Sequence, residues 1–150
     1  STVRKAVELG VAQVQPVLAT RSVARPKGER AENRRSHWQQ VVISACEQCG
    51  RNRVPEVAPI QSLIPWLGSL PPDAQHLMLA PGAQHSLSEL PAPTAPVTLL
   101  IGPEGGLSPN EIRAAESRGF TPVRLGPRVL RTETAALTAL AAMQTLWGDF

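Results

Sequence analysis

The sequence predicts an α/β fold in which helices flank a mostly parallel sheet of four or five strands. Three apolar runs, Gln75–Ala80, Pro96–Ile101 and Pro122–Leu125, each stop abruptly at a turn that contains Gly and Pro. A short apolar run that ends in such a turn is typical of a buried strand. Because ligands of open α/β sheets bind outside the carboxyl ends of the strands, we expect these turns to form a binding site on one side of the sheet.

The composition is that of one globular domain: 150 residues, of which 42% are hydrophobic. No apolar run approaches the roughly 20 residues that span a membrane, and the N-terminus does not form a signal peptide, so we expect a cytoplasmic protein without a membrane partner. With three Trp, two Phe and no Tyr, the composition argues against nucleic-acid binding by stacking of bases on aromatic side chains.

The first residues predict a helix, an edge strand and a long loop. Val3–Leu9 contains helix formers and is followed by Gly10, a residue type that commonly ends a helix. Val11–Ala19 has strand character, and Pro16 places it at a sheet edge or strand start. Thr20–Asn33 is polar, basic and interrupted by Gly and Pro, as expected for a surface loop.

A longer helix is predicted at Arg34–Cys49, closed by Gly50, because apolar residues recur there with the spacing i, i+3, i+4, i+7. These residues are Trp38, Val41, Val42, Ala45, Cys46 and Cys49. The pair Cys46 and Cys49 lies late in this helix, and the sequence has no second Cys or His pair at zinc-ligand spacing. We therefore expect two ordinary thiols and no metal site.

The rest of the chain adds one strand and four helices, at Val57–Ile60 and at Ser62–Leu67, Ser86–Leu90, Ser108–Arg118 and Thr132–Trp147. Ser108, Pro109 and Glu111 form the pattern of a capping box with proline in the first turn. Thr132 or Thr134 could cap the last helix. That helix is apolar on nearly every face, which predicts burial in the core or against a partner.

The turn Gly102–Gly106 indicates the kind of ligand. It lacks the Gly-Lys-Ser/Thr ending of a P-loop and does not match G-x-G-x-x-G, and its Glu104 would repel a phosphate. Three turns with few charged side chains would instead offer backbone N–H and C=O groups to a small heterocycle such as a purine. The alternative is three tight turns that bind nothing.

Two arginines, Arg128 and Arg131, precede the last helix. Arginines beside a helix N-terminus favour an anion. Either side chain could instead form a structural salt bridge with Glu104 or Glu133.

Two stretches, LLIGPEGGLSPNEI (Leu99–Ile112) and LGPRVLRTETAAL (Leu125–Leu137), closely resemble the signature motifs of the bacterial 16S ribosomal RNA uridine-N3 methyltransferases. This is the small-subunit methyltransferase E family of the SPOUT superfamily. KAVELGV (Lys5–Val11) and ACEQCGRNRVPEV (Ala45–Val57) are further matches, so the resemblance covers essentially the whole chain.

The resemblance implies a SPOUT-type α/β fold with a deep trefoil knot at the C-terminus, an exception to the rule that chains avoid knots. The helix Thr132–Trp147 would thread the knot and help to form a homodimer. Family members also carry an N-terminal PUA-like RNA-binding domain and a first strand, which have no counterpart here. We therefore expect residues 1–150 to be the catalytic domain alone.

By the same resemblance, three loops near Leu79–Gly82, Ile101–Gly106 and Leu125–Thr134 would hold S-adenosylmethionine. The residues carried over by position are Leu79, Pro81, Gly82, Ile101, Gly102, Pro103, Gly105, Gly106, Leu125, Gly126, Val129, Leu130, Arg131 and Thr134.

The family methylates N3 of one uridine in the decoding region of 16S RNA, preferring the assembled small subunit over naked RNA. Uracil N3–H must lose its proton for attack, so a cation that stabilises the anionic uracil oxygens or a general base would help. We assign the first role to Arg131 and treat Glu104 and Glu8 as weaker candidates for the base. The competing readings are a ribose 2′-O methyltransferase acting on transfer or ribosomal RNA and a non-catalytic RNA-binding module.

The charge distribution suggests where RNA would bind. Residues 1–53 hold ten Lys/Arg against four Glu, a balance of +6, whereas residues 54–150 hold five Arg against eight acids, a balance of −3. A basic first third is typical of a polyanion-facing side, although a solvated helix and loop would look the same. The candidate phosphate contacts are Arg21, Arg25, Lys27, Arg30, Arg34, Arg35, Arg51 and Arg53.

Overall fold

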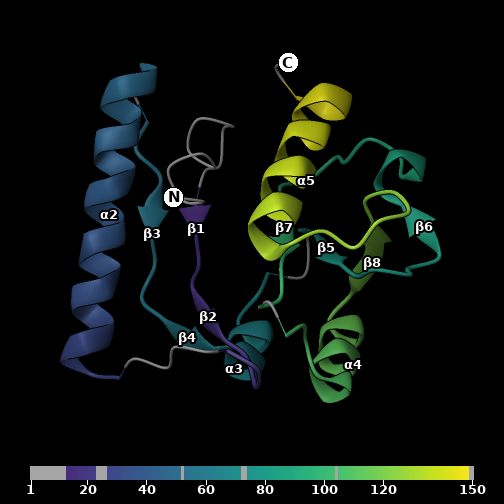
Figure 1. The fold of residues 1–150 in the computed structure, drawn as a ribbon, viewed down its shortest axis with the longest axis horizontal. Coiled ribbons are helices and arrows are strands. Elements are labelled where there is room, and N and C mark those ends of the chain that lie inside the picture. The colour runs from purple at the N-terminus through teal and green to yellow at the C-terminus, as the bar shows by residue number, and fades with distance from the viewer. Residues whose placement is uncertain (1–12, 23–26, 52, 72–73, 104, 149–150) are drawn as a thin grey trace.

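The computed structural model describes residues 13–22, 27–51, 53–71, 74–103 and 105–148. The predicted helix at Val3–Leu9 lies outside the described residues. Within them the predicted α/β class is confirmed, with parallel sheets flanked by helices (Figure 1). None of the described helices is both long and apolar enough to cross a membrane.

The central sheet has four strands, all parallel, in the order β6-β8-β5-β7. Their bounds are Gln75–Leu79 for β5, His85–Ser86 for β6, Val97–Leu100 for β7 and Phe120–Arg124 for β8. The three predicted strands are thus confirmed, although β8 begins two residues before the predicted Pro122 and β6 was not predicted. In β5, one of the two inner strands, Met78 pairs with Leu100 on one side and with Pro122 on the other.

Helices cover both faces of this sheet. On one face, α3 (Leu63–Gly68) and α4 (Pro109–Ser117) pack against a core cluster that contains Met78, Leu100 and Phe120. On the other face, the 3₁₀ turn η1 (Leu87–Glu89) and α5 (Thr132–Trp147) pack over a second cluster. That cluster includes Leu77, Val123, Leu87, Met143 and Trp147.

The N-terminal part forms two separate two-stranded parallel pairs and not one edge strand of the central sheet. β1 (Gln13–Val14) pairs with β3 (Glu56–Val57), and β2 (Val17–Leu18) pairs with β4 (Gln61–Ser62). The predicted strand Val11–Ala19 is therefore interrupted at Gln15 and Pro16, because proline has no N–H for a sheet ladder. The predicted strand Val57–Ile60 was wrong beyond Val57, since the next strand begins at Gln61.

Helix α2 (Glu29–Cys49) starts five residues before the predicted Arg34. The loop before the helix ends at Gly28, which is the N-cap residue and has a positive φ of 57° that glycine adopts readily. Two acidic residues, Glu29 and Glu32, follow in the first turn, where the helix dipole favours negative charge. Gly50 closes the helix as predicted, with a φ of 79°. Cys46 is buried and Cys49 exposed, both as free thiols.

Helix α4 begins with the predicted capping box. The Ser108 hydroxyl accepts from the Glu111 N–H at 3.3 Å, and the Glu111 carboxylate accepts from the Ser108 N–H at 2.9 Å. The predicted caps of α5 were wrong, since Arg131 is the residue before its first turn and no side chain caps it. Within this chain α5 buries only Ala136 and Ala139 among its described side chains, so the expectation of broad burial in the core is not met.

One buried histidine, His76, should make the stability of the fold depend on pH. His76 on β5 stacks on Phe120, with ring centroids 4.8 Å apart, and its Nε2 has no hydrogen-bond partner. Burial lowers the pKa of His76 below its ordinary value of 6.5. The unfolded chain therefore binds more protons than the folded chain just below pH 6.5, and stability falls as the pH drops through that window.

We expect His76→Phe to flatten this pH dependence while keeping the stacked ring. Urea unfolding of the wild type at pH 7.5 and pH 5.5 should show a loss of at most about 1.4 kcal/mol per pH unit from this one site. The matched control is Gln75→Ala, a half-buried neighbour on the same strand that carries no titratable group and should keep the wild-type slope. An unchanged slope in His76→Phe would assign the effect to other groups.

Candidate functional site

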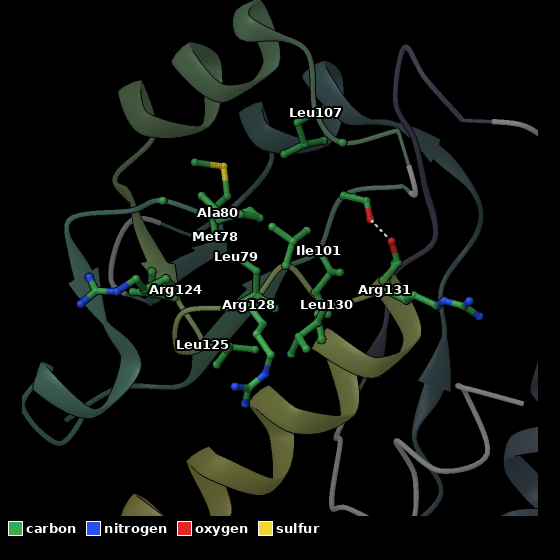
Figure 2. A pocket seen from close by; sticks show the side chains of 18 of the residues that line it. Met78, Leu79, Ala80, Ile101, Leu107, Arg124, Leu125, Arg128, Leu130 and Arg131 are labelled. Atoms are coloured by element: carbon green, nitrogen blue, oxygen red, sulfur yellow. Dashed lines mark hydrogen bonds between the residues drawn. The ribbon is translucent and has the colours of Figure 1, made fainter.

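The loops that follow β5, β7 and β8 enclose a pocket of about 860 Å³ (Figure 2). The pocket lies at the carboxyl ends of these strands, where a ligand site is expected for a parallel sheet. Its remaining wall is the start of α5, through Thr132 and Ala135.

Twelve of the fourteen residues predicted to hold the cofactor line this one pocket. They are Leu79, Pro81, Gly82, Ile101, Gly102, Pro103, Gly106, Leu125, Gly126, Val129, Leu130 and Arg131. The other two do not line it: Gly105 lies against Arg21, and Thr134 is exposed on α5. The structure thus brings the three loops together, and their role in cofactor binding stays a prediction.

Two glycines are required by the shape of the second pocket loop, which follows β7 and runs from Gly102 to Leu107. A Cβ on Gly102 would lie 3.0 Å from Cγ of Leu107, whose side chain folds against the backbone there. Gly106 has a φ of 77°, a left-handed conformation that other residues seldom adopt, and its N–H donates to the Pro103 carbonyl at 2.8 Å. The Gly-rich sequence is therefore needed for close packing as well as for the turn.

Ten lining residues were not among the predicted contacts: Met78, Ala80, Leu107, Ile112, Val123, Arg124, Pro127, Arg128, Thr132 and Ala135. Ala80, Pro127, Arg128 and Thr132 nevertheless lie within the predicted loops. Leu107 and Ile112 lie inside a recognised motif, so their place in that motif was a usable signal. Arg124 had no such signal. Its Nη1 donates to the carbonyls of Ala83 at 2.9 Å and Gln84 at 2.7 Å, which holds the loop after β5 in place.

Thr132 joins two walls of the pocket, because its hydroxyl donates to the Gly102 carbonyl at 3.3 Å. This bond is the dashed line in Figure 2. The neighbouring Arg131 guanidinium points away from the apolar side chains at the centre of the pocket (Figure 2). The suggested salt-bridge partners Glu104 and Glu133 cannot be placed, since Glu104 and the Glu133 side chain lie outside the described part of the chain.

Behind the second loop lies a buried carboxylate. Glu111 is 5% exposed and accepts hydrogen bonds from two backbone N–H groups, that of Ser108 at 2.9 Å and that of Thr20 at 3.0 Å. Burial alone would raise the pKa of Glu111, but these hydrogen bonds outweigh it and hold the pKa below its ordinary value. The carboxylate is therefore ionised at neutral pH.

The basic residues predicted to contact phosphates are not equivalent in the structure. Arg21 donates to the Gly105 carbonyl at 2.9 Å, and Arg35 is paired with Glu32 at 2.6 Å. Arg51 is half-buried and also has an interaction within the protein. The side chains of Lys27, Arg30, Arg34 and Arg53 are exposed, and so is that of Arg21 despite its bond to Gly105. Arg25 lies outside the described residues, as do the two candidate bases Glu8 and Glu104.

The arrangement suits a small heterocyclic ligand. The pocket is lined by apolar side chains and Gly/Pro backbone, and its charged lining residues are arginines. Over the described ranges, no three His, Cys, Asp or Glu side chains come together as a metal site would require.

Comparison with known proteins gives consistent matches. A family model described as an RNA methyltransferase domain matches residues 1–144. The chain is 38% identical to ribosomal RNA small subunit methyltransferase E of Buchnera aphidicola from Schizaphis graminum, over 99% of this chain and 60% of the relative. It is 35% identical to the protein of the same name from Bacillus subtilis, over 94% of this chain and 58% of the relative.

Two solved structures are similar over nearly the whole chain. One is ribosomal RNA small subunit methyltransferase E from Neisseria gonorrhoeae bound to S-adenosyl methionine, with a TM-score of 0.93, 45% identity, and coverage of 99% of this chain and 61% of that one. The other is a putative methyltransferase from Legionella pneumophila in complex with the same cofactor, with a TM-score of 0.93, 40% identity and the same coverage. The chain thus spans about 60% of the length of the relatives that it matches.

Proposed function

Because this chain belongs to the RNA methyltransferase domain family, we propose that it is the catalytic domain of an S-adenosylmethionine-dependent methyltransferase of small-subunit ribosomal RNA. The observation that carries the proposal is the convergence of three loops on one pocket at the carboxyl ends of β5, β7 and β8. Two similar solved structures, which match over 99% of this chain, hold this cofactor.

The pocket fits S-adenosylmethionine by size and chemistry. A volume of about 860 Å³ lies within the range of pockets that enclose small-molecule ligands, about 300–1,000 Å³. Leu79, Ile101 and Leu130 would pack against the adenine, and backbone groups of the Gly/Pro turns would hydrogen-bond its edges. The start of α5 suits the carboxylate of the methionine part, because a helix N-terminus favours an anion. When bound, the cofactor supplies an electrophilic methyl group on a sulfonium.

We further assign the methyl acceptor as N3 of a uridine. Arg131 would stabilise the anionic oxygens of the deprotonated uracil, since its guanidinium is exposed and points away from the apolar side chains at the centre of the pocket. Glu104 and Glu8 remain the weaker candidates for the base. The three pocket loops position the reactants, which is the dominant requirement of an in-line displacement.

The same proposal includes the RNA contacts, the knot and the dimer. The side chains of Lys27, Arg30, Arg34 and Arg53 would contact phosphates of the 16S RNA in the small ribosomal subunit, in the cytoplasm. A C-terminal trefoil knot and a homodimer through α5 are proposed with it. The partial exposure of α5 supports the dimer, because apolar residues such as Leu146, which is 46% exposed, lack full cover within one chain.

Calorimetry and product mapping test the function. The protein should bind S-adenosylmethionine, and methylated small subunits should yield 3-methyluridine after nuclease digestion. A methyl group on a ribose 2′-oxygen would replace the proposed acceptor with the 2′-O alternative. A folded protein that binds no S-adenosylmethionine would favour the non-catalytic RNA-binding module.

Removing charge from α2 tests the RNA surface. We expect Arg30→Ala together with Arg34→Ala to weaken RNA binding and to lower the slope of log affinity against log salt by about 1.4–1.8, because two fewer phosphates are neutralised. Filter binding of a 16S fragment across a salt series measures this. Arg113→Ala, an exposed arginine on α4, should leave the slope unchanged. An unchanged slope in the double variant would remove α2 from the RNA interface.

A further inference from the structure

The turn Ala19–Ser22, which we call the strap, crosses the outer side of the loop Gly102–Leu107 whose inner side lines the pocket. The strap is internally closed, since Ser22 Oγ accepts from the Ala19 N–H at 2.9 Å and the Ser22 N–H donates to the Ala19 carbonyl at 3.1 Å. Ala19 is 3% exposed and belongs to the core cluster of α3, β5 and β8. The strap is therefore anchored independently of the loop that it touches.

Two contacts join the strap to the loop. Arg21 donates from Nη1 to the Gly105 carbonyl at 2.9 Å, across 84 positions of sequence. Its aliphatic part packs so closely that a Cβ added to Gly105 would lie 3.2 Å from Cβ of Arg21. The second contact is the bond from the Thr20 N–H to Glu111, the same carboxylate that accepts from Ser108 at the end of the loop.

Between these points, the described residues of the loop make few other hydrogen bonds. Gly102 is held by the Thr132 hydroxyl, and the turn from Pro103 to Gly106 closes on itself through one backbone hydrogen bond. Gly105 is reached from outside the loop by Arg21. A wall of the pocket rich in glycine would lose much conformational freedom when a ligand binds, and a contact that orders it beforehand reduces that cost.

We propose that Arg21 and Glu111 are positioning residues that hold the Gly102–Leu107 wall in its ligand-binding shape, with Arg21 acting on the cofactor site and not through phosphate contact. The inference rests on the proposed function for the identity of the ligand, S-adenosylmethionine, and for nothing else.

The test separates positioning from phosphate contact by omitting RNA. Arg21→Ala should raise the Kd for S-adenosylmethionine about five- to tenfold in calorimetry without RNA, the loss expected for one hydrogen bond and its packing. Arg21→Lys should recover part of the affinity, because lysine can make one such bond without the planar fork of arginine. The matched control Arg113→Ala, another exposed arginine, on α4, should bind the cofactor as the wild type does.

A second variant changes the other partner of the contact, Gly105 instead of Arg21. Gly105→Ala should also weaken cofactor binding, because the added methyl crowds Arg21 while the backbone at Gly105 is not in the left-handed region. Hydrogen exchange of the cofactor-free protein gives a readout that needs no ligand. The amides of residues 105–108 should exchange several-fold faster in Arg21→Ala than in the wild type.

The outcomes are distinct. If Arg21→Ala changes neither cofactor affinity nor amide exchange and only weakens RNA binding, the positioning role is overturned in favour of phosphate contact. If the wild type binds no S-adenosylmethionine, the proposed function fails, and the exchange experiment still decides whether the strap orders the loop.

Discussion

Replacing Arg131 by alanine is expected to lower kcat by about a hundredfold or more while changing the Kd for S-adenosylmethionine by less than about threefold. The loss of one preorganised group that stabilises developing negative charge has an effect of that order on turnover. Arg131 also lines the cofactor pocket, but its guanidinium points away from the apolar centre, so cofactor affinity should depend on it little. Single-turnover methylation of small subunits and calorimetry with the cofactor measure the two quantities separately.

The matched variant is Arg128→Ala, an exposed arginine three residues earlier on the same loop. If Arg131 has the specific role, Arg128→Ala should retain far more turnover than Arg131→Ala. Arg131→Lys should recover part of the rate, since the charge is kept while the bidentate geometry is lost. A variant Arg131→Ala that loses cofactor affinity but keeps kcat would contradict the assignment.

Glu111→Ala is expected to lower the free energy of unfolding by about 2–4 kcal/mol. The substitution removes a 5% exposed carboxylate and leaves the N–H groups of Thr20 and Ser108 without their acceptor. A loss of this size is a large fraction of the free energy of unfolding of an ordinary domain, which is roughly 5–15 kcal/mol. Urea unfolding at pH 7, followed by circular dichroism, measures it.

Glu116→Ala is the control on the same helix, because Glu116 is exposed and its loss should change stability by no more than about 0.5 kcal/mol. The pH dependence gives a further check. The pKa of Glu111 is lowered from its ordinary value of 4.5, so its contribution is present above that pH and disappears as the pH falls through the lower, folded-state value. The difference in stability between wild type and Glu111→Ala should therefore shrink in acid; a constant difference would point to lost packing alone.

Features set by short-range chemistry could be predicted well. The capping box of Ser108 and Glu111 forms as expected, and Gly50 ends α2 with a left-handed backbone. The ends of β5 and β7 were predicted to within one residue, because an apolar run that meets Gly and Pro changes its preferred conformation abruptly. The start of α2 was missed, since Glu29–Asn33 has the polarity of a loop and its helical character depends on the first-turn acids.

Features that depend on partners far along the chain were not predictable in this way. Arg21 has the sequence context of a phosphate contact, yet it bonds to Gly105. Glu111 could be recognised as a helix cap but not as the acceptor for Thr20, 91 positions away. Arg124, which holds the loop after β5, carried no signal in its neighbours.

The sequence by itself determined the α/β class, the three strand ends and the low charge of their turns, because these follow from local propensity and hydrophobic pattern. Motif resemblance selected fourteen residues, twelve of which line one pocket. Only the tertiary structure decided which side chains line that pocket and which form hydrogen bonds to its loops from outside the pocket. The physical reason is that a hydrogen bond such as Arg21 to Gly105 depends on how the whole chain closes on itself, and neither residue has a local preference that specifies the other.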